Sequence, residues 1–343
     1  MRVVDFVLSA KRISGRPEPT ASRFVPPLMT DFDHDCLVIG GGPAGLTAAI
    51  YLVRFHLSLK LVDGGKSRAS WIPSSHNHAG YPGGINGKEL LGLMRQQAQM
   101  YGASIVPGYV KRLDKIDGGF RAEWGEGSVT ARKVLLATGV TNRRPPMDPE
   151  LHDEALARGL IRYCPICDGY EVTDKKVGVI GSGSHGVAEA VFLRGFTEDI
   201  TLIAPHEAHD LAEEDQAKLK AYGITCIDGP CEAVAAHEGC IVVDTPEGHH
   251  TFDSVYPALG SDLHNQLAVQ VGAELEDDNL VVDDHQRTTV EGLYAAGDVV
   301  LGLDQISHAM GEGGVAAVTI RNDLAKEKPI LRETLSGSIA AKA

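Results

Sequence analysis

Residues 35–63 read DCLVIGGGPAGLTAAIYLVRFHLSLKLVD, and this stretch decides the fold. An apolar strand runs into three glycines with the spacing G-x-G-x-x-G, a helix is expected from about Pro43 to Phe55, and a second strand over residues 57–62 ends at Asp63. This order predicts a complete dinucleotide-binding unit, because the glycines allow a tight turn, a close approach of the pyrophosphate and packing of the helix on the strand. The residues expected to hold the nucleotide here are Gly40, Gly42, Pro43, Ala44, Gly45, Asp63 and Gly64.

A second copy of the motif stands at residues 177–203, which read VGVIGSGSHGVAEAVFLRGFTEDITLI. Each copy is followed further along the chain by a similar apolar strand, LLATG ending at Gly139 and YPALG ending at Gly260. We therefore predict an α/β fold with two Rossmann-like (three-layer ββα) dinucleotide-binding domains. The second candidate site comprises Gly181, Gly183, Ser184, His185 and Gly186.

The second copy differs from the first at the corner that selects the nucleotide. Ala204 stands where an NADH site would carry a carboxylate, and residues 195–216 contain no Lys or Arg to pair with the 2′-phosphate of NADPH. Glu207 would repel that phosphate. The sequence predicts poor use of NADPH and leaves three alternatives open for this site, namely that it is empty, binds NADH weakly or holds a different dinucleotide such as FAD.

A closing signature, EGLYAAGDV, stands at residues 291–299, before a helix expected from about Gly311 to Asn322. An acid at the end of this strand, facing the first motif, suits a second polyol, and in flavoproteins with two dinucleotide-binding domains that polyol is the ribitol of FAD. The further residues expected to hold that cofactor are Ala137, Thr138, Gly139, Gly297, Asp298, Gln305 and Ile306.

A candidate redox pair lies in residues 162–170, which read RYCPICDGY. Cys164 and Cys167 have the CxxC spacing that closes a small disulfide and lowers a thiol pKa, and Asp168 follows as a candidate proton carrier. The alternative, half of a zinc site, needs a second ligand pair that the sequence does not offer, so we predict no metal. The other cysteines are interpreted as packing residues, and they are Cys36, Cys226, Cys231 and Cys240.

Composition excludes several classes of protein. The 343 residues carry 32 basic and 46 acidic side chains, and the resulting charge of −14 disfavours a nucleic-acid partner. No apolar run is long enough to span a bilayer. Six cysteines are too few for a disulfide-stapled secreted domain, which favours a cytoplasmic protein. Residues 1–32 are expected to form a loose extension.

The motifs GGGPAG, CPICDG, GSGSHG and AAGDV have the order and spacing of low-molecular-weight thioredoxin reductases, which the chain resembles over residues 33–325. The resemblance implies a split FAD domain over residues 33–150 and 280–325, an inserted domain over 151–279 that carries the CxxC, and a tail over 326–343. It further implies that Cys167 faces the flavin, Cys164 exchanges with the substrate and Asp168 is the acid and base. Family members are homodimers whose inserted domain rotates, and the implied partner is a thioredoxin-like protein or a small dithiol or disulfide.

The chain departs from that family at three places. These are the corner Ala204–Glu207, the residues Asp304-Gln305-Ile306 and the loop WIPSSHNHAGYPGG at 71–84, which contains His76 and His78 and is expected to run beside the flavin. The departures resemble a pyridine-nucleotide-independent or diflavin branch that includes fungal dithiol oxidases. We therefore expect an FAD-dependent disulfide oxidoreductase, with a dithiol oxidase and a non-enzymatic redox sensor as alternatives. The intact CPICDG argues against the sensor.

Overall fold

The apolar run before the first glycine motif forms strand β1 (His34–Ile39), whose last four residues are buried. In this computed structural model, which describes residues 32–125 and 127–331, β1 pairs in parallel with β2 and β6. Strands covered on both faces are continuously apolar, as β1 is. The sheet contains, in spatial order, β3 (Ser104–Pro107), β2 (Leu59–Asp63), β1, β6 (Gly127–Leu136), β5 (Gly119–Trp124) and β4 (Val110–Ile116), and β18 (Leu293–Ala295) also pairs with β6.

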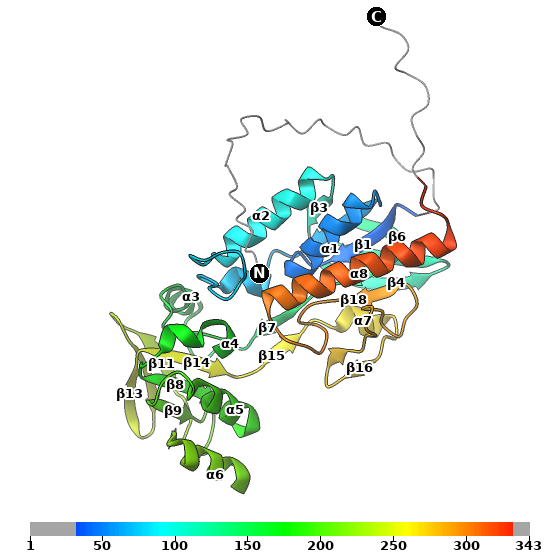
Figure 1. The fold of residues 1–343 in the computed structure, drawn as a ribbon. Coiled ribbons are helices and arrows are strands. Elements are labelled where there is room, and N and C mark those ends of the chain that lie inside the picture. Colours follow the sequence, from blue (N-terminus) through cyan, green and yellow to red (C-terminus); the bar gives the residue numbers. More distant parts are fainter. Residues whose placement is uncertain (1–31, 126, 332–343) are drawn as a thin grey trace, which may run out of the picture.

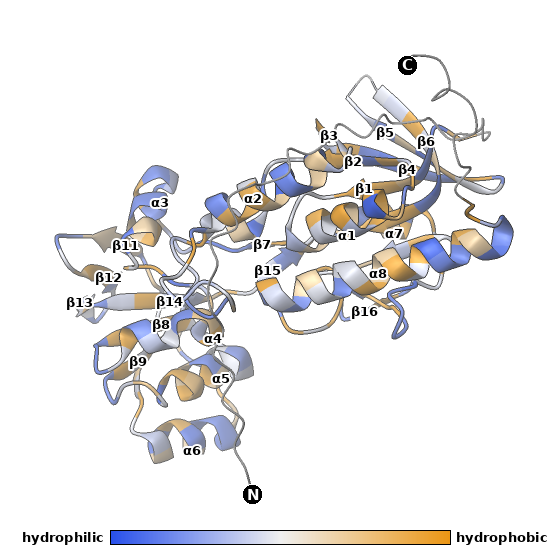
Figure 2. Ribbon diagram, turned by 45° about the horizontal axis from the view of Figure 1, so that its top comes forward, coloured by the Kyte–Doolittle hydropathy of each residue, from blue (hydrophilic) through white to orange (hydrophobic). Residues whose placement is uncertain are grey.

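Three helices cover one face of this sheet, and α1 (Pro43–Arg54) lies between α2 (Gly87–Met100) and α8 (Ile306–Glu327) (Figure 1). Helix α8 starts before and ends after the predicted segment 311–322 and includes its glycines. A Cβ on Gly313 would collide with the Ala44 carbonyl, so glycine lets α8 pack closely on α1. Hydrophobic residues predominate in α1 and alternate with hydrophilic ones along α8 (Figure 2).

The second motif builds the second unit. Its parallel sheet has the order β10-β9-β8-β14 and packs against α5 and α6, while a three-stranded antiparallel sheet lies beside it (Figure 1). The elements are α3 (Pro149–Ala157), β8 (Val177–Gly181), α5 (Gly183–Leu193), β9 (Ile200–Ile203), α6 (Glu213–Tyr222), β10 (Thr225–Ile227), β11 (Ala233–Ala236), β12 (Ile241–Thr245), β13 (Gly248–Phe252) and β14 (Ser254–Ala258).

The second unit is inserted into the first, because β6 and β18 are neighbours although the whole second unit lies between them in the sequence. The predicted fold of two Rossmann-like units, one within the other, is confirmed. The two connections between the units pair as antiparallel strands, β7 (Val140–Asn142) and β15 (Ser261–Leu263).

The segment after β15 packs in the core of the first unit. Leu267, Ala273 and Leu280 belong to that core and come from α7 (Gln266–Gln270) and the hairpin of β16 (Leu275–Glu276) and β17 (Asn279–Leu280). We accordingly propose that the inserted domain ends nearer residue 260 than residue 279 and begins nearer residue 143 than residue 151. The predicted extension 1–32 lies outside the described residues except for residue 32, and the predicted tail lies outside them from residue 332 onward.

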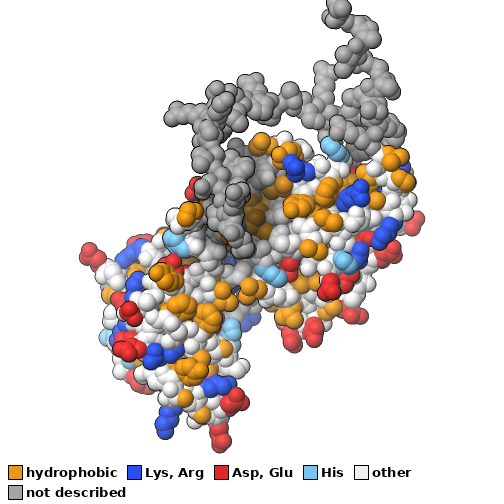
Figure 3. All heavy atoms as spheres, in the orientation of Figure 1, with side chains coloured by type: hydrophobic (Ala, Val, Ile, Leu, Met, Phe, Trp, Pro, Cys, Tyr) orange, Lys and Arg blue, Asp and Glu red, His pale blue; other side chains and the backbone are white. Residues whose placement is uncertain are grey.

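The described surface carries both signs of charge. Figure 3 shows Lys and Arg side chains scattered among Asp and Glu on the face it displays. Among residues 32–125 and 127–331, no helix is long and apolar enough to cross a membrane.

Candidate active site

A cavity of about 910 Å³ lies where the two units meet. Both halves of the first unit and the CxxC segment of the second unit contribute to its wall. The predicted residues that line it are Gly40, Gly42, Pro43, Ala44, Asp63, Gly64, Ala137, Thr138, Gly139, Cys164, Cys167, Asp168, Gly297, Asp298, Gln305 and Ile306. Gly45 instead lies within α1, where a Cβ would collide with the carbonyl of Gly40.

The first glycine turn leaves a concave backbone surface. Gly40 has a φ of +112°, and a Cβ there would collide with the carbonyl oxygen of Ala137 at the end of β6. Helix α1 begins at this turn, and its N-cap Gly42 provides no side-chain acceptor for the amides of the first helical turn. Those free N–H groups and the positive end of the helix dipole suit a pyrophosphate.

Asp63 closes one end of the cavity. It lies at the end of β2, is buried, accepts a hydrogen bond from the Gly65 amide at 2.9 Å and forms an ion pair with Arg95 of α2. A carboxylate fixed in this way is oriented to accept from ribose hydroxyls.

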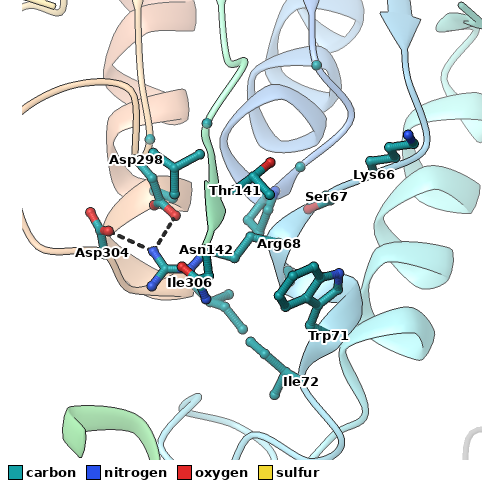
Figure 4. A pocket seen from close by; sticks show the side chains of 18 of the residues that line it. Lys66, Ser67, Arg68, Trp71, Ile72, Thr141, Asn142, Asp298, Asp304 and Ile306 are labelled. Atoms are coloured by element: carbon teal, nitrogen blue, oxygen red, sulfur yellow. Dashed lines mark hydrogen bonds and ion pairs between the residues drawn. The ribbon is translucent and has the colours of Figure 1, made fainter. Parts of the chain in front are cut away.

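Arg68 bridges two acids on the far side of the cavity (Figure 4). Its guanidinium is 3.2 Å from the Asp298 carboxylate and 2.7 Å from that of Asp304. Arg68 starts the short helix η1 (Arg68–Trp71). Burial and the charge of Asp304 raise the pKa of Asp298, while Arg68 opposes that shift. The arginine therefore offsets part of the repulsion between two neighbouring acids at this wall.

Cys164 and Cys167 form a disulfide at the start of α4 (Pro165–Asp168). The side-chain amide of Gln305, at the N-cap of α8, lies 3.2 Å from each sulfur. Asn77 donates to the other end of that amide, Gln305 Oε1, at 3.0 Å. The closing segment of the first unit and the redox pair of the second are thus in direct contact.

Asp168 is held by two partners from the second unit. Its carboxylate lies 3.0 Å from Arg162 and accepts from the Tyr256 hydroxyl at 2.8 Å. Burial raises the pKa of Asp168, and both partners oppose the shift. A carboxyl that stays protonated to a higher pH than usual, beside a disulfide, is able to protonate a leaving thiolate.

The second glycine motif lies away from this cavity, and none of its residues lines the cavity wall. Gly186 packs on Gly181, whereas Ser184 and His185 are exposed at the start of α5. Strand β9 ends beside the buried Ala204.

The loop that follows Ala204 carries exposed His206 and Glu207, and residues 195–216 contain no lysine or arginine. Among the described residues, no cluster of His, Cys, Asp or Glu has the arrangement of a metal site.

Comparison with known proteins decides the family. Residues 34–313 match the family described as "Pyridine nucleotide-disulphide oxidoreductase". The thioredoxin reductase of Treponema pallidum is 32% identical over 306 residues, which are 83% of this chain and 95% of that protein. The thioredoxin reductase of Peptoclostridium litorale is 30% identical with the same coverages. The chain belongs to the thioredoxin reductase family.

Solved structures agree with this assignment. The thioredoxin reductase of Streptococcus pyogenes has a TM-score of 0.79 at 25% identity and covers 85% of this chain and 98% of its own. HlmI has a TM-score of 0.77 at 27% identity, with 85% of this chain and 93% of its own covered. The resemblance expected from the sequence is confirmed, and this thioredoxin reductase family member is a flavin-dependent disulfide oxidoreductase.

Sequence reasoning missed several residues of this thioredoxin reductase site. Arg68 and Tyr256 act through partners that are distant in the sequence, and Arg162 pairs with Asp168 only six residues away but belongs to no motif that marks it. Within the 71–84 loop, His76 and Asn77 line the cavity. The local sequence signal for Arg68 is its position five residues after Asp63, in a loop rich in Ser and Gly.

Proposed function

We propose that FAD occupies the 910 Å³ cavity and exchanges two electrons with the Cys164–Cys167 disulfide, which exchanges them with an external thiol or disulfide. The observation that carries this proposal is the contact of Gln305 with both sulfurs at the wall of the cavity. When bound, FAD supplies a two-electron acceptor and donor next to a thiol pair. The glycine turn, the free amides of α1 and the acids Asp63 and Asp298 fit its pyrophosphate and its two polyols.

The cysteines and Asp168 carry the thiol chemistry of this proposal. Cys164 exchanges with the substrate, Cys167 faces the flavin, and Asp168 returns the proton to the leaving thiolate. Once the disulfide is reduced, the Gln305 amide stands ready to donate to a thiolate, a charge-assisted bond that favours the ionised sulfur.

We further propose that NADPH is a poor electron donor for this protein. The corner that would hold its 2′-phosphate offers a buried Ala204, an exposed Glu207 and no nearby cation within residues 195–216. An unpaired phosphate beside a carboxylate loses the charge-assisted contacts that give NADPH its selectivity.

An aromatic contact between the units also supports the proposal that NADPH is a poor electron donor. Trp71 comes from the first unit but packs on the core of the second. Its ring lies under the Arg144 guanidinium, 4.6 Å from ring centroid to Cζ, and its centroid is 5.7 Å from that of His152 and 5.8 Å from that of Tyr163. A rotation of the second unit that brings its glycine motif to the cavity would break this cluster. The cluster therefore favours the orientation in which the disulfide lies at the cavity.

A dithiol oxidase is the second candidate function, and it is favoured by the lack of Lys and Arg at the corner after β9 that would bind the 2′-phosphate of NADPH. In that case electrons enter from a dithiol through Cys164 and Cys167 and leave by way of the flavin to oxygen or another acceptor. The thiol side of the site is identical in the two candidates.

We propose a homodimer that uses an apolar face of the first unit. Exposed apolar side chains gather on the adjacent helices α1, α2 and α8, and they are Tyr51, Leu93, Met100, Val315 and Val318. A second copy covering such a face removes apolar surface from water. We also infer a cytoplasmic location, because Cys36, Cys226, Cys231 and Cys240 are free thiols, as is usual in a reducing compartment.

Anaerobic titration of the purified yellow protein tests the function. Heat-released cofactor should run as FAD on chromatography. Dithiothreitol should bleach the flavin, whereas NADPH and NADH should bleach it slowly or not at all. A colourless protein that takes up no FAD on reconstitution contradicts the cofactor proposal, and rapid bleaching by micromolar NADPH contradicts the proposal on the donor.

A further inference from the structure

A second, smaller cavity of about 260 Å³ shares Asn77, Gln305 and Ile306 with the wall of the first. Three apolar side chains, Ile166, Leu303 and Ile306, line it together with the polar side chains of His78, Gln305 and His308. Ile166 lies between the two cysteines in the sequence and Gln305 touches both sulfurs, so two residues of this cavity's wall adjoin the redox pair, whose cysteines line the first cavity.

We propose that this cavity binds a small dithiol and that His308 is the general base that ionises it. The proposal rests on the proposed function, because the bound dithiol exchanges with Cys164–Cys167. The occupant we infer is a small molecule, because the cavity is slightly smaller than the ~300–1,000 Å³ pockets of drug-sized ligands and so suits a compound of lower mass.

His308 is held in the orientation of a base. Its Nε2 lies 3.0 Å from Glu312 Oε1, and Glu312 Oε2 accepts from the Gly297 amide at 2.7 Å. A neutral imidazole that donates from Nε2 carries its lone pair on Nδ1. Within the part of the chain that the structure describes, no group forms a hydrogen bond to Nδ1 of His308. The other imidazole of the cavity, His78, bonds through Nδ1 to the Ser307 hydroxyl at 3.2 Å and stacks on Tyr81, so it lacks the carboxylate partner that orients His308.

The exchange balances without any further reactant. The first substrate thiol gives its proton to His308 Nδ1, and its thiolate attacks Cys164 Sγ, which forms a mixed disulfide while the Cys164–Cys167 bond breaks and Cys167 leaves as a thiolate. The second substrate thiol attacks its partner sulfur in the mixed disulfide, and its proton passes by way of Asp168 to Cys164, which leaves as a thiol while Cys167 stays ionised. The substrate leaves oxidised to its disulfide, and the enzyme holds one thiol, one thiolate and a protonated His308.

Flavin bleaching by dithiothreitol in the anaerobic holoenzyme measures this half-reaction. His308→Gln should slow bleaching about 10²-fold at neutral pH, within the usual range for loss of a general base. The deficit should vanish above about pH 9, because thiols with a pKa near ~8.5 then ionise without help. Leu303→Trp should fill the cavity and raise the dithiothreitol concentration for half-maximal rate at least 10-fold. The matched control is His285→Gln, an exposed histidine that lines neither cavity and should leave the rates unchanged.

Two results overturn the proposal. One is a His308→Gln enzyme whose bleaching rate stays at the wild-type value, or falls equally at every pH. The other is a wild-type enzyme that reduced thioredoxin bleaches much faster than dithiothreitol does, with Leu303→Trp changing neither reaction. A Cys164→Ser variant separates this failure from failure of the proposed function, because contact of the Cys167 thiolate with the flavin gives a long-wavelength absorbance band with no substrate present.

Discussion

Arginine at positions 206 and 207 should create the NADPH selectivity that the native corner lacks. Both native side chains are exposed on the loop after β9, so His206→Arg with Glu207→Arg is expected to fold normally. Ala204 is unsuitable for such a change, because it is buried and its carbonyl lies against Gly229. Each new charge-assisted hydrogen bond to the phosphate contributes roughly 1.5–3 kcal/mol. At 1.4 kcal/mol per decade, two such bonds lower the Kd for NADPH about 10²–10⁴-fold if their effects add.

Anaerobic calorimetric titration with each nucleotide measures this change, because it gives the Kd directly and does not require the second glycine motif to reach the flavin cavity. NADH is the matched chemical control, because it lacks the 2′-phosphate and should gain nothing from the substitution. His237→Arg adds a positive charge on an exposed turn elsewhere in the same unit and should have no effect. Equal gains for NADH and NADPH would refute the assignment of this corner. So would a wild-type enzyme that micromolar NADPH reduces at tens per second.

Three further predictions concern proton transfer, orientation and assembly. Burial raises the pKa of Asp168, so its protonated form is present at low pH and is lost as the pH rises through that raised pKa; the rate of disulfide turnover should fall over the same pH range. Asp168→Asn should lower this rate about 10²-fold and remove that pH dependence. Trp71→Ala should weaken the contact between the units by about 2 kcal/mol, roughly half the cost of truncating a fully buried Trp. In a Cys164→Ser background this change should weaken the long-wavelength absorbance band, whereas Trp71→Phe should retain most of the band. Val315→Glu with Val318→Glu should convert a dimer into a monomer by light scattering, and a wild-type monomer at micromolar concentration would contradict the proposed interface.

Much of the fold was predictable because its signals are local. The first motif fixes β1, the tight turn and α1 within twenty residues, and the predicted helix 43–55 differs from α1 by one residue. Helix α8 extends beyond the predicted segment 311–322 at both ends, and its Gly313 allows the close packing on α1 although glycine has a low helix propensity. The edges of the insertion were harder, because α7 carries no signal of which core it joins.

The site was predictable only where a motif marks it. The CxxC and both glycine turns are contiguous patterns, so the sequence names them. Arg68 with Asp298, Asp168 with Tyr256 and Gln305 with the disulfide join residues 88 to 230 positions apart, and only the fold brings them together. In the sequence, Trp71 is a single aromatic residue in a polar loop, and only the structure shows that it packs on the core of the second unit.

The absorbance spectrum of the Cys164→Ser holoenzyme tests the central claim most directly. The account predicts a broad long-wavelength band from the Cys167 thiolate beside the flavin, no such band in Cys167→Ser, and loss of disulfide turnover in both variants with FAD retained. Absence of the band at a pH where the thiol is ionised, or near wild-type turnover in either variant, would contradict the claim that Cys164 and Cys167 pass electrons to and from the flavin.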